Sequence, residues 1–361
     1  MSMKNPLKAL LLSLALPFPA VAASWSAEPI VEGLNIPWGL SYVGDNAVVV
    51  SEKNGTVGLL NLSNQQYSVI GAHPSVAVYG QGGLLDVAQS PFDEKTVYFT
   101  YAKAVGNTIE TTLSQASYSE GKLSDWQDVL VTHSGSDGGR HFGSRITFDD
   151  EGIYFSVGDR GERDNGQNTE THAGSILKIL STGEPTPENP FLSQKTAKPE
   201  IWSYGHRNPQ GLFYDSQEKQ LWSIEHGPRG GDEINLIMKG ANYGWPVTSH
   251  GKEYWGPISV GEAEEKEGII SPLKVYVPSI APGSLLLYRG STYPELNGKL
   301  LAGALKLAHI NVLTIVDGAI TQEQRILEDL GERIRDIEAL PSGDIIFSTD
   351  SGKIYRLVRQ D

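Results

Sequence analysis

The feature that most constrains this chain is a strand pattern that recurs six times along it. Each copy has a short apolar strand, a turn with Asp, Asn, Gly or Lys, and a second strand rich in β-branched and aromatic residues. Residues 145–148 with 152–157, and residues 334–337 with 344–348, are clear examples. Strands of this composition bounded by turn formers, repeated in this way, indicate similar β units packed side by side.

The six copies predict an all-β fold, a six-bladed β-propeller with four-stranded antiparallel blades. The last copy has room for only three strands, so we expect residues 24–34 to add the fourth and close the ring. A β-sandwich or a pair of barrels is the alternative arrangement of the same strands. Sustained helical periodicity is absent, and the best candidate for a short helical turn is residues 322–330.

The first 23 residues predict a cleaved signal peptide. Lys4 and Lys8 precede an apolar run at 9–16, two prolines and the small-residue stretch 20–23, which is the order of a secretory signal. The apolar run is too short to span a bilayer. An apolar strand or a membrane anchor is the alternative. We therefore expect an exported protein whose residues 24–361 form a single propeller domain.

Composition excludes several classes of function. The chain has no cysteine, so disulfides, thiolate metal sites and cysteine nucleophiles are excluded. Its formal net charge of −14 argues against a nucleic-acid partner, which requires clustered Lys and Arg. No other long apolar run exists, so no membrane span is expected.

Residues 225–235, Glu-His-Gly-Pro-Arg-Gly-Gly-Asp-Glu-Ile-Asn, form the most specific motif, and Asn-Tyr-Gly-Trp-Pro follows at 242–246. Asp232 and Glu233 supply hard oxygens, and a backbone rich in glycine and proline leaves carbonyls free for a cation. Calcium takes six to eight such oxygens. The motif therefore suggests a calcium site, although a solvated surface pair is the alternative.

His141 is a candidate general base because imidazole titrates near neutral pH. It precedes the first strand of the third copy, and Asp159 follows one strand later. A carboxylate that accepts the second ring N–H would fix the tautomer of the histidine. A purely structural histidine is the alternative.

Four cations lie at the ends of strands expected to line the ring: Arg207, Lys306, Arg333 and Arg335. Arg333 and Arg335 are two residues apart and so face the same side of a strand. Arginine forks bind carboxylates through two hydrogen bonds. These residues predict a basic pocket for a polyanionic ligand, unless they form surface ion pairs with local carboxylates.

Together these motifs resemble the soluble sugar dehydrogenases that depend on pyrroloquinoline quinone (PQQ), in particular the aldose sugar dehydrogenase branch of bacterial periplasms. The resemblance extends over residues 38–357. The segments that carry it are 80–85 (Gly-Gln-Gly-Gly-Leu-Leu), 141–145 (His-Phe-Gly-Ser-Arg), 205–209 (Gly-His-Arg-Asn-Pro), 226–235, 242–246 and 333–336 (Arg-Ile-Arg-Asp).

This resemblance implies a six-bladed propeller and a set of site residues. His141 would be the catalytic base and Asp159 the carboxylate behind it. The backbone carbonyls of Gly227 and Pro228 would bind a Ca²⁺ that touches PQQ. A second calcium site would involve Glu233, Tyr243 and, less specifically, Asp232. The residues matching positions that contact the cofactor are Gln81, His141, Arg207, Asn208, Lys306, Arg333 and Arg335.

The implied activity is oxidation of the anomeric C1 hydroxyl of an aldose to a lactone, with hydride transfer to PQQ and onward transfer of electrons to an acceptor. A periplasmic monomer or homodimer is expected. The sequence departs from the better-known glucose dehydrogenases at His226, where they have glutamine, and in the loop 251–268. Two alternatives stay open: a non-catalytic propeller that binds carbohydrate or protein, and a calcium-dependent lactonase.

Overall fold

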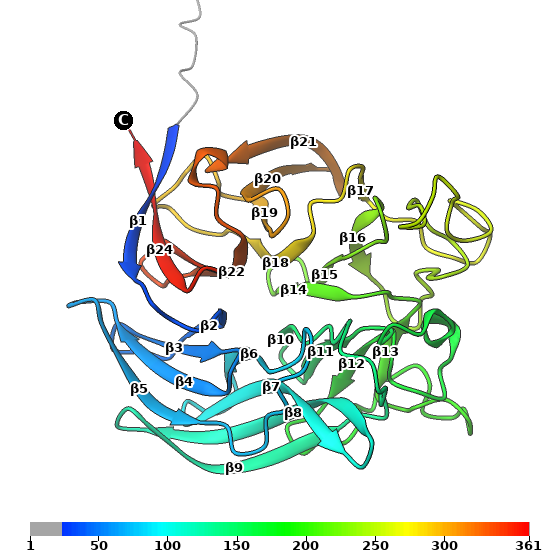
Figure 1. Ribbon diagram of the computed structural model, residues 1–361, viewed down its shortest axis with the longest axis horizontal. Helices are drawn as coiled ribbons and strands as arrows, with labels where there is room; N and C mark the ends of the chain where they lie inside the picture. The colour runs from blue at the N-terminus through cyan, green and yellow to red at the C-terminus, as the bar shows by residue number, and fades with distance from the viewer. Residues whose placement is uncertain (1–23, 361) are drawn as a thin grey trace, which may run out of the picture.

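Six four-stranded antiparallel sheets are arranged around a common axis in the computed structural model, which describes residues 24–360 (Figure 1). This confirms the predicted all-β, six-bladed propeller. The first strand of each blade contacts the first strands of the neighbouring blades, so these strands surround the central channel. The predicted signal peptide, residues 1–23, lies outside the described part of the chain. No helix in that part is long and apolar enough to cross a membrane.

The strands of each blade follow one another in the sequence. The first three blades are β2 (Pro37–Tyr42), β3 (Ala47–Glu52), β4 (Thr56–Asn61) and β5 (Gln66–Ala72); β6 (Leu84–Gln89), β7 (Thr96–Val105), β8 (Thr108–Ser119) and β9 (Lys122–Val131); and β10 (Ile146–Phe148), β11 (Ile153–Val157), β12 (Ser175–Ile179) and β13 (Ile201–Tyr204).

The fourth and fifth blades are β14 (Pro209–Asp215), β15 (Gln220–Glu225), β16 (Asp232–Ile237) and β17 (Lys274–Tyr276); and β18 (Pro282–Leu287), β19 (Lys299–Ala304), β20 (His309–Val316) and β21 (Ala319–Ile326). The sixth contains β22 (Ile334–Ala339), β23 (Ile345–Thr349) and β24 (Lys353–Gln360), joined by β1 (Ser24–Val31).

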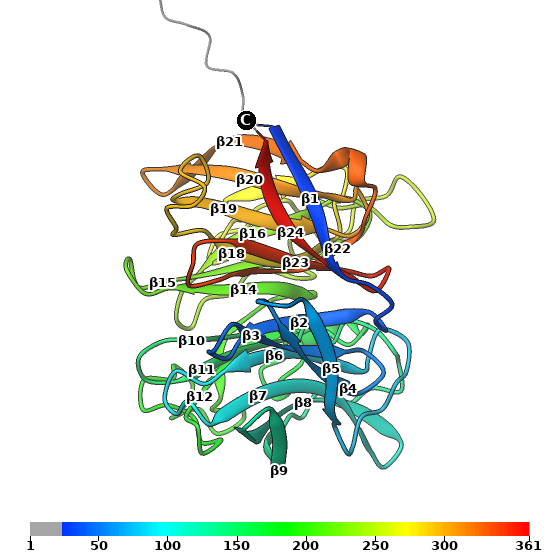
Figure 2. The same ribbon diagram turned by 90° about the vertical axis from the view of Figure 1, so that its left-hand side faces the viewer.

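The N-terminal strand closes the ring, as the sequence predicted. β1 pairs antiparallel with β24, from Ser24 opposite Gln360 to Val31 opposite Ile354. Figure 1 shows the two strands side by side at one edge, and Figure 2 shows the same pair from the side. The last blade therefore combines both ends of the described chain, which ties the first blade to the sixth.

The predicted helical turn at 322–330 is mostly wrong. Residues up to Ile326 belong to strand β21, because Gln322 to Ile326 pair with β20. Only the short 3₁₀ helix η2 (Glu328–Leu330) is helical there. A second 3₁₀ helix, η1 (Arg163–Gln167), lies in the loop between β11 and β12.

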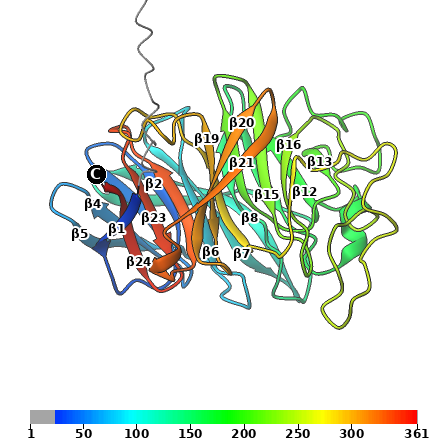
Figure 3. The same ribbon diagram turned by 90° about the horizontal axis from the view of Figure 1, so that it is seen from above.

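The hydrophobic core lies between blades rather than at the centre of the ring. β11 and β12 are completely buried, whereas the outermost strands β5 and β21 are largely exposed. Phe155, Val157 and Leu177 belong to one such cluster, which also contains Tyr98 and Leu113 from the preceding blade. Because blades are held together by apolar contacts along their faces, the channel is left free for polar side chains. Figure 3, seen from above, shows the blades in profile and the long loops beyond their ends.

Four of the six innermost strands share a register shift at their second residue. Such shifts occur between Pro37 and Gly39, Pro209 and Gly211, Pro282 and Ser284, and Ile334 and Asp336. A β-bulge leaves one residue unpaired and re-aims its side chain. The unpaired residues are Trp38, Gln210, Gly283 and Arg335, and all but Gly283 line the cavity described below.

One buried arginine joins all the blades at the level of these bulges. Arg145, immediately before β10, lies 2.6 Å from Asp86 of the second blade and 2.8 Å from Asp336 of the sixth. Its guanidinium also donates to the carbonyls of Gln210 and Gly283, and lies 4.6 Å from the ring centre of Trp38. These partners come from the first, fourth and fifth blades. Burial raises the pKa of Asp86 to about 7, and Arg145 opposes that shift.

We predict that Arg145→Met destabilises the propeller strongly. Removing one partner of a buried ion pair typically costs about 3–5 kcal/mol, because the other charge stays buried without compensation. Urea unfolding followed by tryptophan fluorescence measures the loss. Lys266→Met, which breaks only an exposed pair with Glu262, is the control and should change stability little. Equal losses in the two variants would contradict the assignment of Arg145 as the connection between blades.

Candidate functional site

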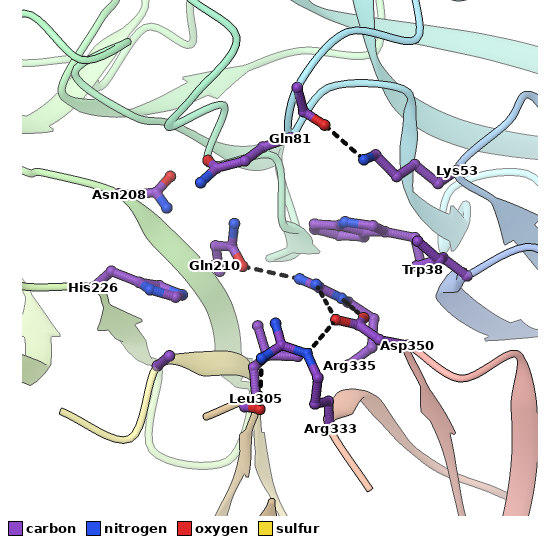
Figure 4. Close-up of a pocket in the computed structure, with 13 residues that line it drawn as sticks. Trp38, Lys53, Gln81, Asn208, Gln210, His226, Leu305, Arg333, Arg335 and Asp350 are labelled. Carbon is purple, nitrogen blue, oxygen red and sulfur yellow. Dashed lines mark hydrogen bonds and ion pairs between the residues drawn. The ribbon is translucent and has the colours of Figure 1, made fainter. Parts of the chain in front are cut away.

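A cavity of about 230 Å³ opens at one end of the channel (Figure 4). Most of its lining residues occupy one of two places in a blade. Gln81, Asn208 and Arg333 precede or begin a first strand, whereas Lys53 and Asp350 directly follow a second strand. Because these two places lie at the same end of every blade, residues distant in the sequence meet around one opening.

Three side-chain amides turn donors toward this cavity. The Oε1 of Gln81 accepts the backbone N–H of His141, and the Oδ1 of Asn208 accepts that of Gly143. The Oε1 of Gln210 accepts from Arg335. Since backbone N–H groups and guanidinium groups only donate, these contacts fix the amide oxygens. The three NH₂ groups have no partner among residues 24–360 and are available to a ligand.

The cavity also concentrates positive charge. Arg333 and Arg335 both contact the carboxylate of Asp350, each with its Nε at 2.9 Å, and Lys53 donates to the Gly80 carbonyl. Burial and the nearby Arg335 lower the pKa of Lys53. Three cations therefore face one carboxylate, and together with the free amide groups they make the wall electropositive and rich in donors.

A histidine, a carboxylate and a tryptophan form a chain beside the cavity. The Nδ1 of His141 lies 2.6 Å from Oδ1 of Asp159, and Oδ2 of Asp159 accepts the indole N–H of Trp245 at 2.8 Å. The backbone N–H of Gly161 also donates to Oδ1. The carboxylate is almost fully buried and held from three directions. The predicted pairing of His141 with Asp159 is therefore present in the structure.

This arrangement leaves His141 able to act as a base. Asp159 accepts the proton on Nδ1, so the neutral ring carries its lone pair on Nε2, which has no hydrogen bond within the described chain. Burial lowers the pKa of His141, the contact with Asp159 opposes the shift, and the charge of Arg207 reinforces it. The ring is thus neutral at neutral pH, as a general base must be.

The backbone at His141 is unusual and depends on glycine nearby. His141 has φ of +55°, a left-handed conformation that costs a non-glycine residue about 1–3 kcal/mol. Gly158 packs against it so closely that a Cβ there would lie 2.2 Å from the His141 carbonyl oxygen. A glycine at 158 is therefore required for the strand that carries Asp159 to approach His141.

His226 and Arg207 lie between the central cavity and a smaller one. The Nε2 of His226 lies 2.6 Å from the carbonyl of Pro282, and Arg207 donates to the His226 carbonyl. Burial and the charge of Arg207 lower the pKa of His226 to about 3, so this ring also stays neutral. His226 lines both cavities, whereas Arg207 lines only the smaller one.

The smaller cavity, of about 10 Å³, contains two glutamates that face each other across β15 and β16. Glu225 accepts from His206 and from the backbone of Arg207. Burial raises the pKa of Glu233 well above its ordinary value, and Glu225 adds to the shift. A cation placed here would relieve both effects. The residues present therefore fit a metal ion.

The donors for such an ion would include backbone carbonyls. No group of three or more His, Asp or Glu side chains within residues 24–360 is placed to hold a metal. Gly227, Pro228 and Tyr243 line the small cavity together with Glu233. The hydroxyl of Tyr243 is occupied by the backbone of residues 236 and 238, so this residue could ligate only through its main chain.

Asp232, the less specific of the predicted ligands, does not line the small cavity but is hydrogen-bonded to the adjoining backbone. Its Oδ1 accepts the N–H of Gly227 and its Oδ2 accepts that of Ala281. Both of its oxygens are therefore already used to shape the loop that carries Gly227 and Pro228.

The structure does not bring all four predicted cations into one pocket. Arg333 and Arg335 line the central cavity, but Arg207 lines the small one. Lys306 is exposed and lines a third pocket, while the preceding Leu305 faces the central cavity. The main chain turns between these two residues, so their side chains point to different sides of one wall.

Sequence reasoning missed several residues of the site. Lys53 and Asp350 each directly follow the second strand of a blade, as His226 does, and Asp159 lies one residue further along its blade. Aligning the six repeats at that position would have found them. No comparable sequence pattern marks Trp38, Gln210 or Trp245. Trp38 and Gln210 enter the site at bulges and Trp245 enters it from a loop, and both features are determined by the folded ring.

Comparison with known proteins places the chain in a family. The family model described as Glucose / Sorbosone dehydrogenase matches residues 34–356. Aldose sugar dehydrogenase YliI of Escherichia coli (strain K12) is 32% identical over 349 residues, which cover 94% of each chain. The uncharacterized protein slr1608 of Synechocystis is 36% identical over 355 residues, which cover 92% of this chain and 86% of that protein.

Solved structures agree with this placement. The soluble aldose sugar dehydrogenase from Escherichia coli in its apo-form has a TM-score of 0.89 and 30% identity, covering 93% of this chain and 100% of that one. The PQQ-bound aldose sugar dehydrogenase from Streptomyces coelicolor has a TM-score of 0.79 and 25% identity, covering 95% of this chain and 100% of that one.

We predict that His141 titrates below 6.5 and that Asp159→Asn lowers its pKa further. Burial disfavours the imidazolium, and the carboxylate that partly stabilises it would be lost. Two-bond ¹H–¹⁵N spectra of protein labelled at histidine measure both values. His226, whose low pKa owes nothing to Asp159, is an internal control that should not change. A pKa at or above 6.5, or one that rises in the variant, would contradict the geometry.

Proposed function

The chain belongs to the glucose/sorbosone dehydrogenase family, and from this premise we propose that it is a PQQ- and calcium-dependent aldose sugar dehydrogenase. It would oxidise the anomeric C1 hydroxyl of aldoses to lactones. We further propose that residues 1–23 direct the protein to the periplasm, where it works as a monomer or homodimer. Its small-molecule partners would be an aldose and an acceptor for the electrons released.

The observation that carries this proposal is the electropositive, donor-rich wall of the central cavity beside a neutral histidine. PQQ has three carboxylates and an ortho-quinone. The oxygens of these groups are hydrogen-bond acceptors, so they match a wall that offers donors and positive charge. Arg333 and Arg335 offer guanidinium groups, and Asn208 and Gln210 offer free amide N–H groups. The residues present therefore fit the cofactor in both charge and hydrogen-bonding capacity.

When bound, PQQ supplies an electrophilic quinone carbon that accepts the hydride of the sugar; the protein supplies position and charge. Arg333, Arg335 and Lys53 would hold the carboxylates, with Asp350 keeping the two arginines in place. The motif resemblance described above extends the proposed set to Gln81, Arg207, Asn208 and Lys306. Trp38, which packs 5.4 Å from the Arg335 guanidinium, offers an aromatic surface in the same cavity.

His141 would remove the proton of the anomeric hydroxyl through its free Nε2. Asp159 holds the ring in the required tautomer and stabilises the imidazolium that forms, while Trp245 holds Asp159. Gln81 is fixed by the backbone of His141, so its NH₂ group is placed to orient the sugar or the cofactor. A base, an orienting carboxylate and an amide donor are thus available together.

Calcium would bind at the smaller cavity and the adjoining loop. The carbonyls of Gly227 and Pro228 would hold the ion that contacts PQQ, and Glu233 with the main chain of Tyr243 would hold a second. Glu233 is the support for this part, since its raised pKa marks a buried carboxylate that a cation would stabilise. Asp232 would shape the loop through its two backbone hydrogen bonds, and it is the less specific of the candidate ligands.

We predict that PQQ and calcium together convert chelator-treated protein into an active aldose dehydrogenase. The assay is dye-linked oxidation of a panel of aldoses, with arms that receive neither addition, PQQ alone, calcium alone, or both. Only the last arm should show full activity, because calcium polarises a cofactor oxygen. A visible spectrum should change when sugar is added. If none of the aldoses in the panel were oxidised although PQQ is bound, the proposed function would be wrong.

We predict that His141→Ala lowers kcat by about 100- to 10,000-fold, the usual contribution of a general base. PQQ affinity should stay within a few-fold of the wild type, because the arginines that hold the carboxylates are unchanged. Steady-state kinetics and a PQQ titration measure the two effects separately. A non-catalytic binding protein would show no turnover to lose, and a hydrolase would retain its dependence on His141 without any need for PQQ.

A further inference from the structure

A third pocket, of about 380 Å³, lies beside the central cavity and is lined by basic side chains. Arg229 and Lys252 are exposed and extend from neighbouring segments that pair through their backbones. Lys306 and His250 complete the basic lining, and the rest consists of glycine, serine, valine and proline. No carboxylate lines this pocket, so its positive charge is not neutralised within it.

The cations of this pocket lack the partners that lysine and arginine usually have on a protein surface. Within residues 24–360, Arg229, Lys252 and Lys306 form no ion pair, and Arg229 donates instead to the carbonyl of Gly256. His250 alone is near a carboxylate, at 3.7 Å from Glu264. Three unpaired cations around one concave surface form an anion-binding arrangement.

The positive charge of this pocket contrasts with the net negative charge of the chain. The chain has a formal net charge of −14, and the same loop that carries Lys252 carries glutamates at 262, 264, 265 and 267. None of these glutamates lines the pocket. The central cavity is the neighbouring cationic site, but there Arg333 and Arg335 contact the carboxylate of Asp350, whereas the third pocket has no carboxylate in its lining.

The pocket and the central cavity share a wall. Ser279 lines the pocket and Ala281 lines the cavity; likewise Lys306 lines the pocket and Leu305 the cavity. Figure 4 shows Leu305 on the opposite side of the cavity from Gln81. Because Gln81 is hydrogen-bonded to His141, the sugar would lie on the Gln81 side. The basic pocket thus lies on the side of the cavity away from the proposed position of the sugar.

We propose that this pocket binds an anionic one-electron acceptor, an inference that rests on the proposed function. Oxidation of one aldose to a lactone releases two electrons and two protons. Two acceptor molecules would each take one electron in turn, and the protons would pass to solvent. Arg229 and Lys252 hold each acceptor by charge, one wall away from the site where the sugar is oxidised.

Direct binding tests the pocket without cofactor or turnover. The probe is hexacyanocobaltate(III), a redox-inert trivalent anion, titrated calorimetrically into the purified protein at low salt. Lys252→Glu should weaken binding at least about fivefold, Lys252→Gln should weaken it less, and added salt should weaken it in the wild type. Lys266→Glu is the matched control, because Lys266 lies on the same loop outside the pocket, and it should bind like the wild type.

Turnover supplies the second arm. In the holoenzyme, Lys252→Glu should lower kcat/KM for ferricyanide severalfold and leave that for the cation hexaammineruthenium(III) unchanged or raised. Lys306 stays unaltered in these variants, since the proposed function places it among the cofactor-binding residues. If Lys252→Glu left kcat/KM for ferricyanide unchanged, or lowered kcat/KM for both acceptors by the same factor, the proposal would be overturned.

The two arms also separate this proposal from others. Failure of hexacyanocobaltate(III) to bind, or binding that Lys252→Glu does not weaken, would overturn the anion pocket even in an active dehydrogenase. If Lys252→Glu changed KM for glucose 6-phosphate but not for glucose, and left ferricyanide unaffected, the pocket would serve an anionic substrate group instead. Normal anion binding without any aldose oxidation would overturn the proposed function, not the pocket.

Discussion

The ring depends on one guanidinium at its centre. Arg145 contacts carboxylates of the second and sixth blades, carbonyls of the fourth and fifth, and the indole of Trp38 in the first. Apolar contacts hold neighbouring blades together in pairs, whereas Arg145 contacts all five of the other blades. Because its carboxylate partners are buried, their charge requires Arg145, and the blades are fixed relative to one another at the base of the cavity.

The backbone at the same level of the ring also orients the side chains of the candidate site. Bulges at the second residue of the inner strands turn Trp38, Gln210 and Arg335 into the channel, while the regular part of each strand continues to pair. In four of the blades the residue directly after the second strand reaches the same opening, namely Lys53, His226, Leu305 and Asp350. A repeated fold thus gives six pairs of nearly equivalent positions, and function depends on which residue occupies each of them.

This explains what the sequence could and could not predict. Strand composition and turn residues repeat locally, so the six blades and the closing strand β1 were predictable, whereas 322–326 was misread because an exposed outer strand has little apolar alternation. His141 and Asp159 were found from their chemistry and spacing. Lys306 faces another pocket because the main chain turns after Leu305. Trp245 contacts Asp159 although the two residues are 86 positions apart in the sequence. Neither placement could be predicted from the local sequence pattern.

The electrostatics of the site serve two purposes at once. Cations suited to hold a polyanion also disfavour the imidazolium of His141, and the Arg207 charge adds to burial in keeping that ring neutral. Asp159 acts in the opposite direction and prevents the pKa from falling so far that the ring would be a poor base. Its own pKa is lowered by His141 despite burial. A ligand-binding field and a usable general base therefore depend on the same balance of charges, set by residues from separate blades.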